Sequence, residues 1–221
     1  MSKRISIHGC SWTQGEWHQD GGYQLHGGLA QYLREAGHAV RNWGRAGDSN
    51  HRQIAQMRDI WANGPRPDFS VIVLTDICRD LHDIPAREGE TLEAYCQRAM
   101  ERYRGEILLC DRVLVVGGLQ IVPEEWFGVA TVNWFDLLTL EEPWRQWWPD
   151  HFINYATQRE LAERGLWPQW WPQDTQSLQN KNHDTAWRVL VRNRQWFWPD
   201  GFHPNRHGHG RLARWVQERL Y

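Results

Sequence analysis

Apolar runs alternate with stretches of helical periodicity along the first part of the chain. The expected strands are short apolar runs at 4–8, 38–43, 69–74, 112–116 and, more weakly, 129–132. The expected helices carry apolar residues at helical spacing and cover 23–36, 51–61, 92–109 and 205–220. Strands that alternate with helices predict an α/β fold with a parallel sheet and right-handed crossovers.

This alternation stops in the segment from about 137 to 198. The segment contains EEPWRQWWPD and LWPQWWPQD, where Trp-Pro pairs interrupt any long helix. Of the 16 tryptophans in the chain, 11 lie between Trp126 and Trp198. We interpret the segment as an elaborated Trp-rich insertion that packs on the sheet within a single domain spanning 1–221.

The overall composition excludes several classes of protein. The chain has 221 residues, of which 41% are hydrophobic and 24% charged, which is typical of one globular domain and not of disordered or fibrous proteins. The formal net charge is -2 with both signs scattered, which argues against nucleic-acid binding through a broad basic surface. The apolar runs are too short to span a membrane, and no signal peptide is visible. We therefore expect a cytoplasmic setting, with a virion or secreted setting as the alternative.

The four cysteines favour no metal site or disulfide framework. Cys10, Cys78, Cys96 and Cys110 lack the close pairing of zinc ligands, so free thiols in a reducing compartment are expected. His203, His207 and His209 form an HxxxHxH pattern, which we interpret as a polar helix start. No metal and no cofactor are expected.

Candidate chemistry lies at the two ends of the chain. Ser11 stands in Gly9-Cys10-Ser11 directly after the first expected strand. Asp200 and His203 stand in DGFHPN directly before the last expected helix. A serine hydroxyl needs a base to accept its proton and a carboxylate to orient that base. The alternative is structural, with Ser11 and His203 as helix caps.

In these segments the sequence resembles the SGNH (GDSL-like) serine hydrolase superfamily. GCSWT is similar to the first block of the family, NWGRAGDS (42–49) to the second, and DGFHP (200–204) to the last. The resemblance implies a three-layer α/β/α fold of the flavodoxin-like type, with a parallel sheet of about five strands. It also implies Ser11 as nucleophile, His203 as base and Asp200 as its partner, with the backbone N–H groups of Ser11 and Gly47 in the oxyanion hole.

The third block departs from the pattern of the family. FSVIVLTDICRD (69–80) occupies its place, but the family pattern Gly-x-Asn-Asp is replaced by Leu74-Thr75-Asp76. An aspartate would repel an oxyanion, so Thr75 or a backbone N–H is the candidate donor in place of the asparagine. Losing one such donor costs about 10²–10³ in turnover.

Several further residues are candidates for substrate contact. Trp12 follows the nucleophile, Asp48 belongs to the second block, and Arg79 follows the third strand. The structural alternatives are that Asp48 shapes its loop and that Arg79 pairs with Asp80 or Asp76. The inserted tryptophans either form a core or line a cleft, the latter with candidates at 144, 147, 148, 170 and 171.

Three functions are consistent with these observations. The first is an esterase that forms an acyl-enzyme on Ser11, with a small acyl group on a carbohydrate or another small ester as substrate. The second is an acyltransferase that uses the same triad. The third is a non-catalytic module on a degenerate scaffold that binds a glycan or a protein partner. The oligomeric state stays open.

Overall fold

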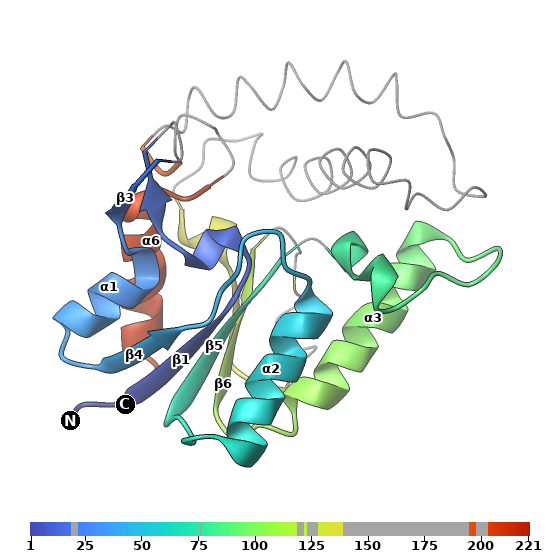
Figure 1. Ribbon diagram of the computed structural model, residues 1–221, viewed down its shortest axis with the longest axis horizontal. Coiled ribbons are helices and arrows are strands. Elements are labelled where there is room, and N and C mark those ends of the chain that lie inside the picture. The colour runs from blue at the N-terminus through green and yellow to red at the C-terminus, as the bar shows by residue number, and fades with distance from the viewer. Residues whose placement is uncertain (19–21, 76, 119–121, 123–127, 139–194, 198–202) are drawn as a thin grey trace.

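A parallel β-sheet forms the centre of the molecule (Figure 1). The structure is a computed structural model and describes residues 1–18, 22–75, 77–118, 122, 128–138, 195–197 and 203–221. Within these residues the main sheet has five strands: β1 (Arg4–Gly9), β4 (Ala39–Asn42), β5 (Phe69–Leu74), β6 (Val113–Gly117) and β7 (Thr131–Asn133). The expected strands are thereby confirmed, with small shifts at their ends.

The order of the strands gives the sheet its doubly wound topology. The order is β4-β1-β5-β6-β7, and every neighbouring pair is parallel. Counted along the chain this is 2-1-3-4-5, the flavodoxin-like order. The chain reverses its winding direction between β1 and β5, where Ile7 pairs with Val71 and Gly9 with Val73. In such sheets ligands bind beyond the carboxyl ends of the strands at this reversal, which is where Ser11 follows β1.

Helices cover both faces of this sheet (Figure 1). The described helices are α1 (Gly28–Glu35), α2 (Asn50–Asn63), α3 (Leu92–Ile107) and α6 (Arg206–Gln217), with 3-10 turns η1 (Ser11–Thr13), η2 (Ile77–His82) and η3 (Trp134–Leu137). The first and last helices pack together on one face, and α2 and α3 pack together on the other. The expected three-layer α/β/α architecture is confirmed.

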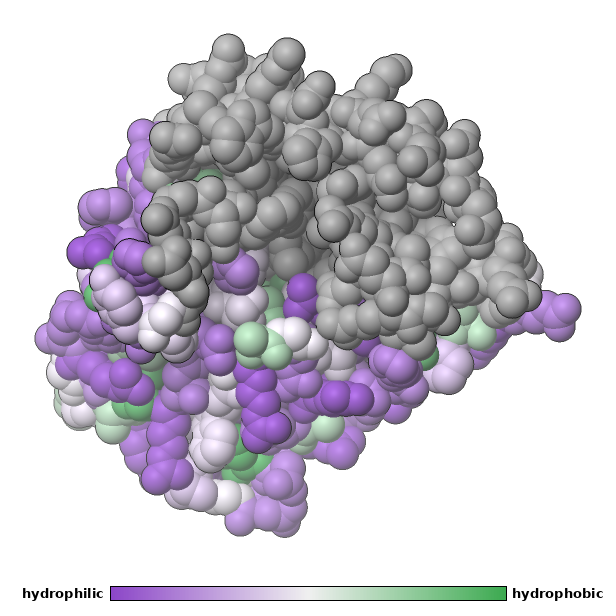
Figure 2. Space-filling model, turned by 45° about the horizontal axis from the view of Figure 1, so that its top comes forward, coloured by the Kyte–Doolittle hydropathy of each residue, from purple (hydrophilic) through white to green (hydrophobic). Residues whose placement is uncertain are grey.

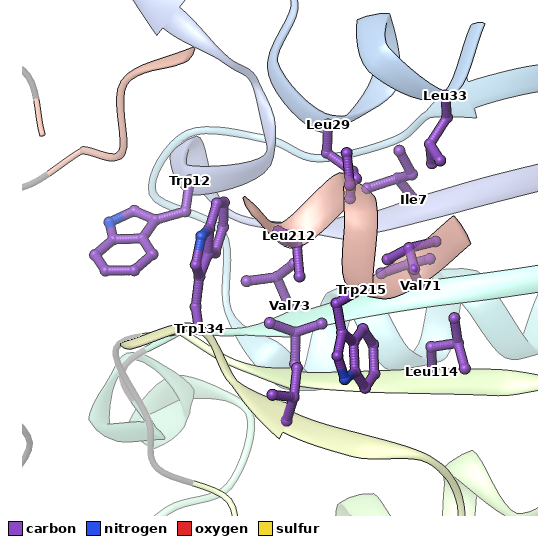
Figure 3. Packing of buried hydrophobic residues seen from close by; sticks show 14 of the residues in the cluster. Ile7, Trp12, Leu29, Leu33, Val71, Val73, Leu114, Trp134, Leu212 and Trp215 are labelled. Carbon is purple, nitrogen blue, oxygen red and sulfur yellow. The ribbon is translucent and has the colours of Figure 1, made fainter. Parts of the chain in front are cut away.

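Alternation along the strands divides the hydrophobic core between the two faces. Ile5 and Ile7 of β1 point with Val71 and Val73 of β5 toward α1 and α6, where Leu212 completes the cluster (Figure 3). The alternate residues of β5 point toward α2 and α3, where the buried cluster contains Ile72, Leu74, Ile54, Met57 and Tyr103. Burying one such side chain contributes about 1.5–3 kcal/mol, so the two clusters account for much of the stability.

One expected helix is shorter than its sequence pattern. The pattern predicted a helix over 23–36, but the structure starts α1 at Gly28 and forms a hairpin from β2 (Glu16–Trp17) and β3 (Gln24–His26). Gly28 has φ +59°, a left-handed conformation that interrupts the helix on its N-terminal side. The helix stop at Gly37 is confirmed, with φ +88°.

The two ends of the chain lie together where β1 begins. The hydroxyl of Tyr221 donates to the carbonyl of Met1 over 3.2 Å, and both termini appear side by side (Figure 1). On the face drawn in Figure 2 the described surface is mainly hydrophilic with small scattered hydrophobic patches. Most of the expected Trp-rich segment lies outside the described residues, namely 139–194 and 198. Its packing on the sheet therefore stays a prediction. The single domain over 1–221 stays a prediction.

Candidate active site

Ser11 occupies a sharp turn at the carboxyl end of β1. Gly9 has φ +149°, and a Cβ there would lie 2.6 Å from the Thr13 methyl and 2.9 Å from the Val73 carbonyl oxygen, so only glycine fits. The N–H of Thr13 then donates to the Cys10 carbonyl over 3.0 Å, which closes η1. The turn leaves Ser11 partly exposed at the edge of the sheet where the topology predicts a ligand site.

His203 meets this serine from the other end of the chain. Its Nε2 lies 2.8 Å from the Ser11 Oγ, although 192 positions separate the two residues. A neutral imidazole whose proton is on Nδ1 can accept the hydroxyl proton at Nε2. The predicted nucleophile and base are therefore brought together. Asp200, the predicted orienting carboxylate, lies outside the described residues, and its role stays a prediction.

Asn205 fixes the segment that carries His203. Its side-chain oxygen accepts the N–H groups of His207 at 2.9 Å and Gly208 at 3.2 Å, which caps α6. Its amide nitrogen donates to the carbonyls of Gln195 at 3.0 Å and Phe197 at 3.3 Å. Sequence reasoning assigned no role to this residue, and the signal was an asparagine at the first position of an expected helix.

The second-block loop lies against the nucleophile turn. The N–H of Trp43 donates to the Ile7 carbonyl at 2.8 Å, and the N–H of Arg45 donates to the Gly9 carbonyl at 3.0 Å. Gly47 follows in an exposed turn with φ +72°. The loop that contains the predicted oxyanion donor thus runs beside Ser11, and the role of the Gly47 N–H stays a prediction.

Gln53 joins the two loops from below. Its side-chain oxygen accepts the Gly9 N–H over 2.9 Å, and its amide nitrogen donates to the Asp48 carboxylate. The other Asp48 oxygen accepts the N–H of Ser49 over 3.1 Å. Both carboxylate oxygens of Asp48 are therefore used within the loop, which favours its structural interpretation over substrate contact. No sequence pattern pointed to Gln53, because a glutamine in a helix is ordinary.

Asn50 fixes the end of β5 where the third block departs from the family pattern. Its side chain accepts the Thr75 N–H at 2.7 Å and donates to the Thr75 carbonyl at 2.9 Å. The backbone N–H of Thr75 is therefore already used. The buried Thr75 hydroxyl, in contrast, has no hydrogen-bond partner among the residues that the structure describes. Asp76 lies outside those residues.

Asp80 is a buried structural acid. One of its oxygens accepts the N–H of His51 at the start of α2 over 2.9 Å, and the other accepts the Tyr103 hydroxyl. Burial raises the pKa of this carboxyl to about 7, because the charged form loses its hydration. Asp80 thus binds α2 and α3. The pairing of Arg79 with a neighbouring acid stays a prediction. Arg79 lies partly buried in η2, and its contact with substrate stays a prediction.

The remaining histidines do not converge on one point. His207 is exposed on α6, whereas His209 is fully buried and accepts the Leu29 N–H at Nδ1 over 3.2 Å. Burial lowers the pKa of His209 to about 3, and it does the same to His8 beneath α2. Among the described residues no three metal-ligating side chains form a cluster.

Trp12 lies in the hydrophobic core below the serine. It is 2% exposed, and its ring meets Trp134 edge-on with 5.6 Å between the ring centroids (Figure 3). The indole N–H of Trp134 donates to the Gly208 carbonyl over 3.0 Å, which connects this pair to α6. The packing supports a role in positioning Ser11 and gives no support to substrate contact by Trp12. The candidate cleft tryptophans at 144, 147, 148, 170 and 171 lie outside the described residues.

Comparisons with known proteins found similar solved structures at low sequence identity. No protein-family model matches the chain, and no curated protein matches it either. Solved structures that are similar to it include a lipolytic protein of the G-D-S-L family from Veillonella parvula (16% identity, TM-score 0.47, 97% of this chain and 96% of that one). Another is a GDSL-like lipase from Bacteroides thetaiotaomicron (14% identity, TM-score 0.43, 99% and 87%).

A third similar structure is an alpha/beta hydrolase enzyme from the metagenome of Lake Arreo, Spain, with 16% identity, a TM-score of 0.43, and coverage of 99% of this chain and 94% of that one. The geometry of Ser11 and His203 is the observation that bears on a reaction. No helix in the described part of the chain is long and apolar enough to cross a membrane.

Proposed function

We propose that this protein is a serine-dependent ester hydrolase that forms an acyl-enzyme on Ser11. The observation that carries the proposal is the 2.8 Å contact between the Ser11 Oγ and the His203 Nε2. This distance lies within the range that a nucleophile and its general base require. The position of Ser11 at the reversal point of the sheet supports the same conclusion.

The reaction follows from the roles of these groups. His203 accepts the hydroxyl proton while Ser11 Oγ attacks the ester carbonyl, and the protonated imidazole then returns the proton to the departing alcohol. Water attacks the acyl-enzyme with His203 as base again, which releases the acid and restores Ser11. Asp200 is proposed to hold the Nδ1 proton of His203 and to stabilise the imidazolium.

The oxyanion of the tetrahedral intermediate needs donors that are not already used. We assign this role to the backbone N–H groups of Ser11 and Gly47 and to the hydroxyl of Thr75. The hydroxyl is the candidate at Thr75 because its N–H donates to Asn50, whereas the hydroxyl has no partner among the described residues. The substrate is proposed to be a small ester, with an acyl group on a carbohydrate as the preferred class because of the many tryptophans.

The nucleophile is tested by activity-based labelling. A fluorophosphonate probe should label the native protein, and Ser11→Ala should abolish both labelling and hydrolysis of p-nitrophenyl acetate, a loss of at least about a thousandfold. His203→Ala should lower both to a similar degree, whereas the matched variant His207→Ala on the exposed side of α6 should leave them unchanged. A folded native protein that neither labels nor turns over would contradict the proposal. Product analysis with and without sugar acceptors distinguishes hydrolysis from acyl transfer.

The Thr75 hydroxyl gives a second test, in which stability and turnover should not fall together. Thr75→Val removes a buried hydroxyl that lacks a partner, so the free energy of unfolding should stay equal or rise slightly, by up to about 1 kcal/mol. Turnover should fall about 10²-fold, because an oxyanion donor is lost. Thr75→Ser keeps the hydroxyl and serves as the control. Unchanged turnover in Thr75→Val would remove this residue from the oxyanion hole.

A further inference from the structure

A carboxylate near the nucleophile and an arginine near the base form an ion pair across the two ends of the chain. Glu16 in β2 accepts three donors of Arg206 at the start of α6: its backbone N–H at 2.9 Å, its Nε at 2.8 Å and its Nη2 at 3.5 Å. We call this pair the Glu16–Arg206 clasp. In Figure 1 the hairpin formed by β2 and β3 lies beside the beginning of α6.

The clasp lies close to the reacting groups along both segments. Glu16 follows Ser11 by five positions and Arg206 follows His203 by three, so only a short stretch of chain separates each charge from the group it would position. The turn between Ser11 and Glu16 is itself held, because the Gln14 N–H donates to the Ser11 carbonyl over 3.0 Å. A displacement of the clasp would therefore shift the Ser11–His203 contact.

Tight backbone packing beside the clasp makes this transmission stiff. A Cβ on Gly28 would lie 2.7 Å from the Gly15 Cα and 2.8 Å from the His209 Cε1. The nucleophile segment, α1 and α6 thus meet at a point where no side chain fits between them. The clasp closes the same junction from the solvent side, since the Glu16 side chain is 15% exposed and that of Arg206 is 44% exposed.

The charges of the clasp support each other. Burial alone would raise the pKa of Glu16, but hydrogen bonds and the positive charge from Arg206 outweigh it and lower that pKa below the usual value. The side-chain hydrogen bond that Arg206 donates to Glu16 in turn raises the pKa of the guanidinium. Both groups stay ionised at neutral pH, and a charged pair with a planar fork on one carboxylate is directional as well as attractive.

We propose that the Glu16–Arg206 clasp is a positioning device that holds the His203 imidazole at the Ser11 hydroxyl. This inference rests on the proposed ester hydrolysis and adds two positioning residues to it. A misplacement of reacting groups by a fraction of an ångström to 1 Å costs up to about a hundredfold in rate, whereas a partly exposed ion pair contributes little to stability. The signature of the clasp is therefore a loss of rate without a matching loss of stability.

The chain contains a matched ion pair that touches no site residue. Arg58 of α2 and Glu106 of α3 form a partly exposed pair on the other side of the sheet, with side chains that are 47% and 26% exposed. A variant of this pair removes a similar charge interaction between two elements of the fold. Glu106→Gln is therefore the control for stability and for general effects of lost charge.

The experiment uses a graded series of variants in the full chain. Arg206→Ala removes the guanidinium but keeps the backbone N–H on Glu16, whereas Glu16→Ala removes all three contacts. We expect kcat on p-nitrophenyl acetate to fall about threefold in Arg206→Ala and about tenfold in Glu16→Ala, with KM within about twofold of the native value. The double variant should be no slower than Glu16→Ala. The fluorophosphonate labelling rate should follow kcat, and Glu106→Gln should match the native protein.

Two results would overturn the positioning role. One is that Glu16→Ala keeps the kcat and the labelling rate of the native protein. The other is that Glu16→Ala loses far more melting temperature than Glu106→Gln, so that the loss of rate is explained by destabilisation. Failure of the hydrolase proposal itself looks different, because the native protein would then neither label nor turn over. In that case ¹⁵N NMR of the His203 imidazole tests the positioning role. In Glu16→Ala the Nε2 resonance should move toward its position in Ser11→Ala, where the contact with the hydroxyl is lost. An unchanged Nε2 resonance in Glu16→Ala would contradict the inference.

Discussion

The two helical layers on either side of the sheet are built in different ways. The layer of α1 and α6 joins a helix from the beginning of the chain to one from its end. In the other layer α2 and α3 are close in sequence, because β5 is the only strand between them along the chain. The first layer carries His203 to Ser11. The second supplies the amide side chains of Asn50 and Gln53, which hold the loops around the serine.

This difference separates two requirements of the proposed reaction. The distance between nucleophile and base depends on long-range packing of the first layer, which includes the Trp12–Trp134 pair and the buried His209. The shape of the oxyanion region depends on hydrogen bonds from the first turn of a single helix, α2. Damage to one layer should therefore change the alignment of the base, and damage to the other should change the stabilisation of the transition state.

The largest effect is expected at the junction of the first layer. Gly28→Ala places a Cβ at φ +59° against the Gly15 Cα and the His209 ring, and should lower the free energy of unfolding by about 3–5 kcal/mol through strain and overpacking. Gly37→Ala is the control, because its φ of +88° is also left-handed but the space around it is open; it should cost about 1 kcal/mol. Urea unfolding measures both, and equal losses would show that the close packing is unimportant.

A smaller effect is expected in the second layer. Asn50→Ala leaves the N–H and the carbonyl of Thr75 without their partner, which should lower the free energy of unfolding by about 2–4 kcal/mol. Asn50→Asp keeps an acceptor for the N–H and adds a negative charge near the proposed oxyanion. Its turnover should therefore fall further than its loss of unfolding free energy explains. Chemical denaturation and kcat on p-nitrophenyl acetate test this. A parallel loss of stability and rate in Asn50→Asp would contradict the electrostatic explanation.

Acid should change stability through buried ionisable groups on both sides of the sheet. His8 and His209 have pKa values lowered to about 3, so the unfolded chain binds both protons first below pH 6.5 and stability falls. Asp80 acts in the opposite direction, because its pKa is raised to about 7 and the folded state holds its proton between about pH 7 and 4. These three groups together contribute a net decrease of about 1.4 kcal/mol in the free energy of unfolding per pH unit between pH 6 and 4.5.

Asp80→Asn removes the opposing group and sharpens this prediction. The amide keeps an acceptor for the His51 N–H and a polar contact for the Tyr103 hydroxyl. The decrease of the free energy of unfolding should then steepen by about 1.4 kcal/mol per pH unit in the same range. Urea unfolding at several pH values gives both slopes. Identical slopes for the native protein and the variant would mean that Asp80 is already ionised in the fold.

Local pattern predicted most of the secondary structure for a physical reason. The buried strands β5 and β6 are continuous apolar runs, and the helices α2, α3 and α6 show apolar residues at helical spacing, so each element is recognisable within its own window. The hairpin of β2 and β3 was missed because its strands are short and Leu25 falls in phase with the helical pattern that follows. The conformation of Gly28, set by its contacts with Gly15 and His209, ended that pattern.

The α/β alternation and the candidates Ser11 and His203 could be inferred from sequence, because a turn after a strand and a histidine before a helix are local features. That these two residues meet at 2.8 Å, and that Asn50, Gln53, Glu16 and Asn205 hold the surrounding loops, is visible only in the folded chain. For a polar side chain at an ordinary helix or strand position, the local sequence does not indicate which group it will bind. Their roles arise from contacts between segments that are distant along the chain, which no local pattern contains.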